Sequence, residues 1–309
     1  MNYVPEGWLI DTQENKNAIL TPGALLDACR EGRILEARAL ICDSAHNLIV
    51  DLHGIRGIIP REEGAIGIRE GTVRDIAMIS RVNRPVCFVV TEITRDENGT
   101  PIALLSRRKA QERCMEEFIS HLRPGDVVDA RITHLESFGA FADIGCGVAS
   151  LLPIDSISVS RIDHPRERFT VGMDIRAVVK STENRRITLS HKELLGTWEE
   201  NAAAFAPGET VAGIVRSVEP YGIFVELAPN LAGLAEPKDG VSPGQQASVF
   251  IKSIVPSRMK IKLIIIETFE YDYRPDPPTY FFTERHMDRF TYSPAGCDRT
   301  VESLFPQGE

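Results

Sequence analysis

Short runs in which apolar and polar residues alternate dominate the chain between residues 34 and 267. A period of two is typical of half-buried strands, because successive side chains of a strand point to opposite faces of its sheet. Turn-forming residues separate the runs, as in Asp96-Glu97-Asn98-Gly99, where we expect a hairpin turn. In the first third of the chain the predicted strands are 34–41, 47–52, 58–60, 86–93 and 102–106.

Three segments carry helix signals instead. Thr21 followed by Pro22 supplies an N-cap and a first-turn proline for a short helix before the first strand. The polar stretches 107–122 and 191–205 separate three groups of strands and are predicted to be linker helices.

The second and third strand groups repeat one motif, which sets the architecture. Each copy has a Gly-acidic-x-Val opening, an aromatic-Gly-x-aromatic strand and a further apolar strand. The openings at Gly125 and Gly208 are 83 positions apart, and this spacing predicts three domains in a chain of 309 residues. The copies read GDVV, FGAFADI and VASLLP from residue 125, and GETV, YGIFVEL and LAGL from residue 208.

About five short strands per group, with a helical or irregular insert between the third and fourth, fit a small closed barrel of the OB class better than a sandwich. We therefore predict an all-β fold of tandem five-stranded OB barrels joined by linker helices. The predicted domains are an N-terminal arm and short helix (1–30), a barrel (31–107), a linker helix (108–122), a barrel (123–192), a linker helix (193–206), a barrel with a short insert (207–267) and an aromatic, acidic tail (268–309) that packs back over the third barrel.

The aromatic pair of each repeat is the best indication of function. In a flat strand Phe138 and Phe141 would point to opposite faces, but a bulge at Gly139 would bring both rings to one face. Two rings on one face form a platform for unpaired bases, worth about 1 to 3 kcal/mol per stacked base. The alternative is that the rings fill a core. Their recurrence at Tyr221 and Phe224 favours the platform.

The net charge of −9 is distributed unevenly along the chain. Residues 123–192 carry 10 Lys and Arg against 9 Asp and Glu, residues 207–263 carry 6 against 5, and residues 264–309 carry 4 against 9. Acidity therefore lies mainly outside the two platform-bearing repeats. Counterion release can then supply only a modest share of any RNA affinity, and stacking has to supply more.

The six cysteines are scattered and form no Cys-x-x-Cys pair, which indicates a reducing, cytoplasmic environment and neither disulfides nor a structural metal. We expect no cofactor and no catalytic residues, because phosphate loops, nucleophile-base arrangements and clustered metal ligands are not seen in the sequence. Membrane insertion and secretion are not expected either.

The ordered motifs resemble those of the S1 RNA-binding domain family. The second group matches through GDVV, FGAFAD and RITLS (186–190), and the third through the equivalent segments up to KIKL (260–263). The first group, with Asp51, 58–60 and 104–107, is similar to the N-terminal repeats of the ribosomal protein that gives the family its name. The resemblance covers about residues 31–267.

The resemblance also implies which residues face nucleic acid: two aromatics of the second strand, a histidine after the third strand, and an aspartate and an arginine near the fifth. The second repeat has Phe138, Phe141 and Arg186 at the aromatic and arginine positions, with Pro153 and Thr182 at the other two. The third has Tyr221, Phe224 and Lys260, with Glu236 and Pro256. The first has His46, Ile49 and Pro101, so no platform is expected there.

Two further groups of residues keep alternative interpretations. His134, one strand position from the platform, could bond a base edge or a phosphate, or could simply be exposed. Arg161, Arg166 and Arg168 in the insert of the second repeat could follow a phosphate backbone or form surface ion pairs.

The predicted function is non-catalytic binding of single-stranded RNA, in particular mRNA, by a cytoplasmic, ribosome-associated protein. Phe138, Phe141, Arg186, His134, Tyr221, Phe224 and Lys260 are the predicted RNA-binding residues. The first repeat is expected to contact the small ribosomal subunit. A protein-interaction scaffold and an accessory subunit in RNA processing or decay are the alternatives.

Overall fold

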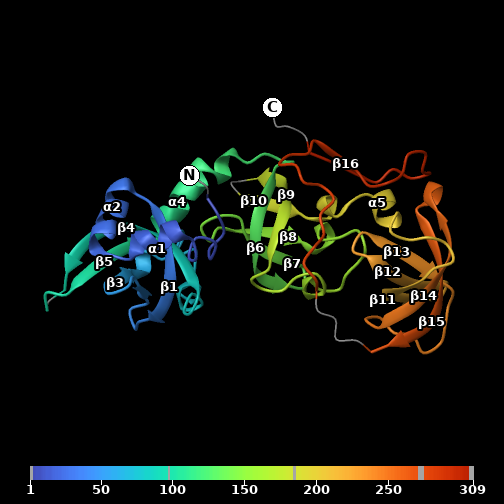
Figure 1. The fold of residues 1–309 in the computed structure, drawn as a ribbon, viewed down its shortest axis with the longest axis horizontal. Helices are drawn as coiled ribbons and strands as arrows, with labels where there is room; N and C mark the ends of the chain where they lie inside the picture. The colour runs from blue at the N-terminus through green and yellow to red at the C-terminus, as the bar shows by residue number, and fades with distance from the viewer. Residues whose placement is uncertain (1–2, 97, 184–185, 271–274, 306–309) are drawn as a thin grey trace. The chain divides into compact units, whose positions relative to one another are not determined.

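The computed structural model describes residues 3–96, 98–183, 186–270 and 275–305. In this part of the chain three five-stranded closed barrels follow one another (Figure 1). Neighbouring strands are antiparallel, except that the third strand of each barrel pairs in parallel with the fifth. This topology confirms the predicted class of tandem OB-type barrels. Glu97 of the predicted hairpin turn, and residues 271–274 and 306–309 of the predicted tail, lie outside the described residues.

The first barrel has the strand order β1-β2-β3-β5-β4, and its core includes the fully buried Phe88, Leu48 and Leu105. The helix expected before the first strand is confirmed: Thr21 accepts the Ala24 N–H at 3.2 Å. The elements are α1 (Gln13–Ile19), α2 (Pro22–Glu31), β1 (Ile34–Cys42), β2 (Leu48–Asp51), β3 (Arg56–Ile59), α3 (Ile76–Ile79), β4 (Pro85–Arg95), β5 (Pro101–Ser106) and α4 (Arg107–Glu117).

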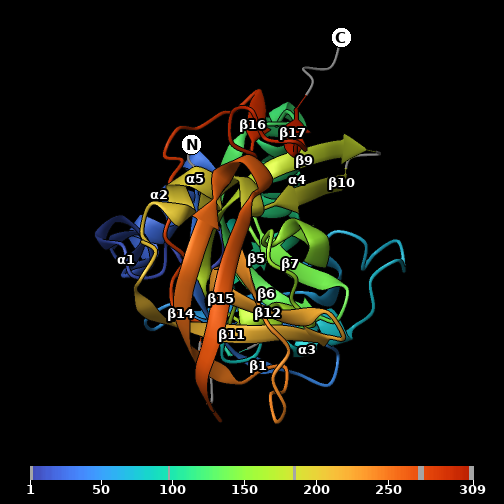
Figure 2. The ribbon, with the colours of Figure 1, turned by 90° about the vertical axis from the view of Figure 1, so that its right-hand side faces the viewer.

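The second and third barrels have the orders β10-β8-β7-β6-β9 and β11-β12-β13-β15-β14. Figure 2 shows the long hairpin of β14 and β15 in the third barrel. The elements are β6 (Val127–Glu136), β7 (Gly139–Asp143), β8 (Ala149–Pro153), β9 (Asp174–Glu183), β10 (Arg186–Ser190), α5 (Trp198–Ala202), β11 (Thr210–Glu219), β12 (Gly222–Ala228), β13 (Leu231–Ala235), β14 (Gln246–Val255) and β15 (Lys260–Phe269).

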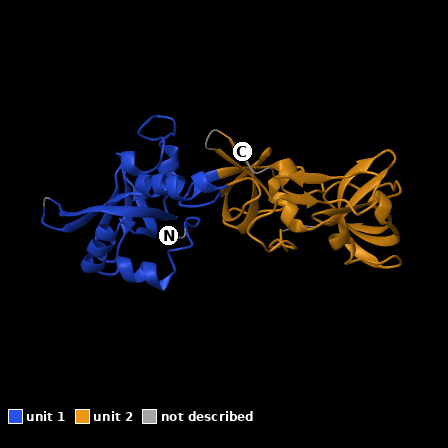
Figure 3. Cartoon of the chain, turned by 90° about the horizontal axis from the view of Figure 1, so that it is seen from above, with its two compact units in different colours: residues 1–122, 143–149 blue, residues 123–142, 150–309 orange. Residues whose placement is uncertain are grey.

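The chain forms two compact units (Figure 3). Unit 1 comprises residues 1–122 and 143–149, and unit 2 comprises residues 123–142 and 150–309. Unit 2 therefore contains most of the second barrel, the whole third barrel and the tail. Both aromatic pairs belong to this unit.

Asn230, in the turn between β12 and β13, ties the two barrels of unit 2 together. Its side chain is fully buried and accepts the Val159 N–H at 3.0 Å. It also donates to the carbonyls of Lys192 and Gly196, at 2.8 and 2.9 Å. Because Val159 and Lys192 come from the second barrel and its linker, this turn is fixed against them.

The tail lies along both barrels of unit 2, not along the third alone as the sequence suggested (Figure 1). On the second barrel, Arg176 donates to the carbonyls of Phe282 and Glu284, at 2.6 and 2.7 Å. On the third, the Tyr292 hydroxyl donates to the Asn230 carbonyl at 2.5 Å. The tail ends in a small hairpin of β16 (Arg289–Thr291) and β17 (Glu302–Leu304).

Candidate nucleic-acid interface

Each repeat of unit 2 places its two aromatic rings side by side on the barrel surface. The ring centroids of Phe138 and Phe141 are 6.2 Å apart and the rings meet edge to face at 87°. Tyr221 and Phe224 repeat this arrangement at 6.3 Å and 86°. Phe138 is 55% exposed and Tyr221 68% exposed, while the second ring of each pair is half-buried. The rings therefore form surface platforms and do not fill a core.

In the third barrel Gly222, the equivalent of Gly139, pairs in regular register with Glu219, so the aromatic pair of that barrel needs no bulge at its glycine. Phe138 and Tyr221 lie in the two-residue turns before β7 and β12, so strand alternation does not govern their direction. The glycine is needed for another reason. A Cβ at Gly139 would lie 2.5 Å from the Leu152 carbonyl oxygen, so a larger residue would push the third strand away.

The third barrel has a groove of about 1020 Å³ beside its aromatic pair. Tyr221 and Phe224 line it together with the ends of β13, β14 and β15 and with a loop of the tail. Its charged lining residues are five cations and two carboxylates: Lys252, Arg258, Lys260, Lys262, Arg299, Glu236 and Asp298. This positive excess in an acidic chain suits an anionic ligand with flat apolar groups.

Pairing across the sheet explains how the aromatic and cationic groups come together. Phe224 on β12 is paired with Leu234 on β13, which is paired with Lys262 on β15. Paired residues of neighbouring strands share a face, so Lys262 lies on the platform side of the sheet. Lys260 lies two residues earlier on the same strand and shares that face. Both lysines are exposed.

The second barrel offers a smaller set of polar groups around its platform. Arg186 begins β10 and is exposed. Thr188 pairs with Leu151 in the way that Lys262 pairs with Leu234. Arg186 and Lys260 each lie two residues earlier on the same strand, so they occupy equivalent positions. His134 is exposed on β6, and its Nε2 lies 2.7 Å from a carboxylate oxygen of Glu136.

The first barrel has no comparable aromatic pair among its described residues. His46 lies in the turn before β2, and Ile49 is only 8% exposed. The assignment of Pro101 to the arginine position is wrong by one residue. Since Ile58 pairs with Leu104 in this barrel, the equivalent of Lys260 is Ile102.

The assignment of Pro256 as the counterpart of Thr182 is also wrong. Thr182 pairs with Ile187, and the equivalent pair in the third barrel is Ile254 with Ile261. Four residues, 256–259, separate β14 from β15, whereas only 184–185 separate β9 from β10. Because the two hairpins differ in length, matching by sequence position alone gave Pro256 as the counterpart of Thr182.

The arginines of the insert in the second barrel divide between two roles. Arg168 is 7% exposed and donates to the Glu226 carboxylate, so it takes no part in an open binding face. Arg161 and Arg166 are exposed. Neither interpretation of this cluster predicted the buried ion pair of Arg168 with Glu226.

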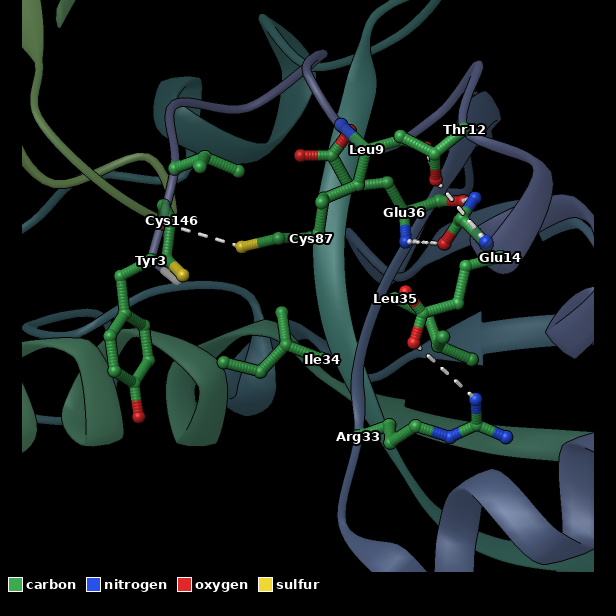
Figure 4. Close-up of a pocket in the computed structure, with 12 residues that line it drawn as sticks. Tyr3, Leu9, Thr12, Glu14, Arg33, Ile34, Leu35, Glu36, Cys87 and Cys146 are labelled. Atoms are coloured by element: carbon green, nitrogen blue, oxygen red, sulfur yellow. Dashed lines mark hydrogen bonds and ion pairs between the residues drawn. The ribbon is translucent and has the colours of Figure 1, made fainter. Parts of the chain in front are cut away.

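A second cavity, of about 400 Å³, lies in unit 1 under the N-terminal arm (Figure 4). The polar side chains that line it bond mainly to the arm and to one another. Glu36 is fully buried and accepts the N–H groups of Gly7, Leu9 and Ile10 at 2.9–3.1 Å. Burial raises the pKa of Glu36 to about 7. These contacts fix the arm to β1 and leave the cavity without an evident ligand-binding group.

Other chemistry is not supported by the described part of the chain. Within it, no group of three or more histidine, cysteine, aspartate or glutamate residues is arranged to hold a metal ion. The six cysteines are free thiols. No described helix has the length and apolarity needed to cross a membrane.

Several known proteins are similar to this chain. A family model described as the S1 RNA binding domain matches residues 121–192. The small ribosomal subunit protein bS1 of Leuconostoc lactis is 32% identical over 234 residues, covering 70% of this chain and 52% of the relative. The bS1 protein of Staphylococcus aureus strain COL is 29% identical over 239 residues, covering 72% and 58%. The chain thus spans about half the length of these relatives.

Among solved structures, a multidomain protein with nucleic acid binding domains from Streptococcus pneumoniae is similar, at 14% identity and a TM-score of 0.26. The similarity covers 76% of this chain and 74% of that one.

Proposed function

We propose that the chain belongs to the family of proteins with tandem S1 RNA-binding domains and that it binds single-stranded RNA through unit 2. The observation that carries the proposal is the pair of exposed platforms with the same ring geometry, 6.2 and 6.3 Å, at equivalent places in two barrels. Unpaired bases stack on such rings whatever their sequence, because every base has a π-face.

Each platform has its own cationic partner for the RNA backbone. In the second barrel Arg186 binds phosphate or sugar oxygens, and exposed His134 lies within reach of a base edge. In the third barrel Lys260 takes the role of Arg186. The protein-interaction alternative expected the platform faces to be covered, for instance by the tail, whereas Phe138 and Tyr221 are exposed and leave both faces open to bases.

The first barrel has a different role in this proposal. Without an aromatic pair it contributes little to RNA binding and instead contacts protein, with the small ribosomal subunit as the partner. The names of the bS1 relatives support association with the small ribosomal subunit, and the choice of the first barrel rests on its lack of an aromatic pair. The whole protein is then a non-catalytic, cytoplasmic factor that brings mRNA to the ribosome.

The test is fluorescence anisotropy with a labelled single-stranded oligoribonucleotide of about 20 nucleotides, at low and moderate salt. We expect Phe138→Ala and Tyr221→Ala each to weaken binding about 5- to 150-fold, which corresponds to the loss of one stacked base. Phe269→Ala is the matched control, because Phe269 is 45% exposed at the opposite end of β15 from Lys260. If the double variant Phe138→Ala/Tyr221→Ala and the control bind RNA with equal affinity, the platforms are not the RNA site.

The role of the first barrel is tested with the whole chain, because residues 143–149 belong to unit 1 and a shorter chain would lose them. The Phe138→Ala/Tyr221→Ala variant is sedimented with small ribosomal subunits. We expect it to cosediment as the unaltered protein does while failing to bind free RNA. Loss of both activities together would assign ribosome association to the platforms as well.

A further inference from the structure

The fourth strand of each barrel contains a β-bulge at the same place. In β14 the pairing with β15 shifts between Ile251 and Ser253, so Lys252 has no partner in the ladder. The same shift leaves Lys180 unpaired in β9 and Thr91 unpaired in β4. A bulged residue is released from the ladder, and the local bend redirects its side chain. The three positions are therefore structurally equivalent.

The type of residue at this bulge correlates with the presence of an aromatic platform in the same barrel. The two barrels with platforms have lysine there, and both lysines are exposed. The first barrel has Thr91, whose hydroxyl donates to the Leu104 carbonyl at 3.0 Å and so stays within its own ladder. The cationic bulge thus occurs in the same barrels as the stacking surface.

Both lysines reach the segment that directly follows the third strand of their barrel. The Lys252 ammonium lies 3.9 Å from a carboxylate oxygen of Glu236, the residue after β13, and lines the groove with Tyr221. The Lys180 ammonium donates to the Ser156 hydroxyl at 3.0 Å, in the 3₁₀ turn after β8. The bulges therefore place one positive charge at the same point of both barrels that carry an aromatic platform.

We propose that Lys180 and Lys252 bind phosphates of the RNA strand whose bases stack on the neighbouring platform, an inference that rests on the proposed function. A lysine ammonium is a flexible point charge that binds phosphate without selecting a base. The exposed contact between Lys252 and Glu236 is weak in water, so a phosphate can replace it. Each platform then has a second backbone contact besides Arg186 or Lys260.

The experiment measures the dissociation constant of the full chain for a single-stranded oligoribonucleotide across a range of salt concentrations. Each phosphate contact contributes about 0.7 to the slope of log affinity against log salt for a single strand. We expect Lys180→Ala and Lys252→Ala each to reduce the slope by about 0.7, and the double variant by about twice that. Lys252→Arg should restore the slope, because it keeps the charge.

Lys238→Ala is the matched control, since it removes the same charge from the third barrel outside the groove, where Lys238 donates to the Ile265 and Ile266 carbonyls. Slopes of the Lys180 and Lys252 variants equal to that of the control, with binding still sensitive to Tyr221→Ala, would overturn the lysine assignment alone. RNA binding insensitive to Tyr221→Ala and Phe138→Ala would overturn the proposed function instead. A slope reduced only by the bulge variants supports the inference.

Discussion

Arg168 and Glu226, 58 positions apart in the chain, form a buried ion pair between the insert of the second barrel and β12 of the third. Arg216 donates to the same carboxylate through Nε and Nη2, at 2.8 and 3.0 Å. Glu226 thus pairs with two guanidinium groups that are almost fully buried, and Arg216 also donates to the Glu167 carboxylate. Two barrels that look independent in the sequence are joined at this point.

Replacing Glu226 by alanine should destabilise unit 2 strongly. The change leaves Arg168 and Arg216 buried without their shared carboxylate, and breaking a buried pair in this way costs about 3 to 5 kcal/mol. Urea unfolding combined with hydrogen exchange locates the loss in unit 2. Glu267→Ala removes an exposed carboxylate of β15 and is the control, with an expected change below about 0.5 kcal/mol. Equal urea midpoints for Glu226→Ala and Glu267→Ala would contradict the prediction.

Acid should destabilise unit 2 through His191. Burial lowers the pKa of His191 to about 4, and its ring lies between the Ile157 carbonyl and the Tyr280 hydroxyl. The unfolded chain binds the proton near pH 6.5, so the unfolding free energy falls as pH drops from 6.5 to 4. The loss is about 3 kcal/mol for this shift. His191→Gln should flatten the pH dependence, and an unchanged profile in that variant would refute the assignment.

His286 should act in the opposite direction. Its hydrogen bond to Asp126 raises the pKa of His286, and the second ring nitrogen lies 3.2 Å from Asp288. Protonated His286 stabilises the packing of the tail on the second barrel. This stabilisation is complete below pH 6.5 and is lost as the pH rises through the raised pKa of His286 in the folded chain. The amide of Met287, bonded to the Gly125 carbonyl at 2.9 Å, is the probe by hydrogen exchange. Its protection factor should fall with rising pH, and should not do so in His286→Gln.

Gly139→Ala should displace the first platform. The new Cβ would lie 2.5 Å from the Leu152 carbonyl oxygen and 3.0 Å from the Pro153 Cα, both of which are backbone atoms. We expect a loss of about 1 to 3 kcal/mol from overpacking, together with weaker RNA binding. Gly23→Ala is the control, because a Cβ there meets no atom within 4 Å apart from its chain neighbours and the backbone of its own helix. Equal thermal midpoints for the two variants would show that the β7–β8 contact can relax.

Much of the fold could be predicted from the sequence, because a repeated motif and a period of two report local chain geometry directly. The same pattern identified the aromatic pairs. It did not show that Tyr221 lies in a turn before β12, where no bulge at Gly222 is needed to bring the ring beside Phe224. The assignments of Pro101 and Pro256 failed for a similar reason: the register of a hairpin depends on its length and on contacts across the sheet.

The cations of the groove show where sequence reasoning stops. Lys262, two residues after Lys260 on one strand, could have been found from strand alternation. Lys252 could not be distinguished from an ordinary exposed lysine, because the bulge that directs it is visible only in the pairing. Arg299 reaches the same groove from the tail, through a tertiary contact without any local signal.

The fixed turn at Asn230 has a consequence for how long an RNA must be. If the platforms bind RNA as proposed, they form a bivalent receptor, because the second and third barrels are joined in one unit and hold the two binding sites apart without a flexible tether. Once one platform holds a base, the other meets the strand at an effective concentration set by the nucleotides between them. RNAs too short to span the gap should gain no avidity, so affinity should rise abruptly at a threshold length.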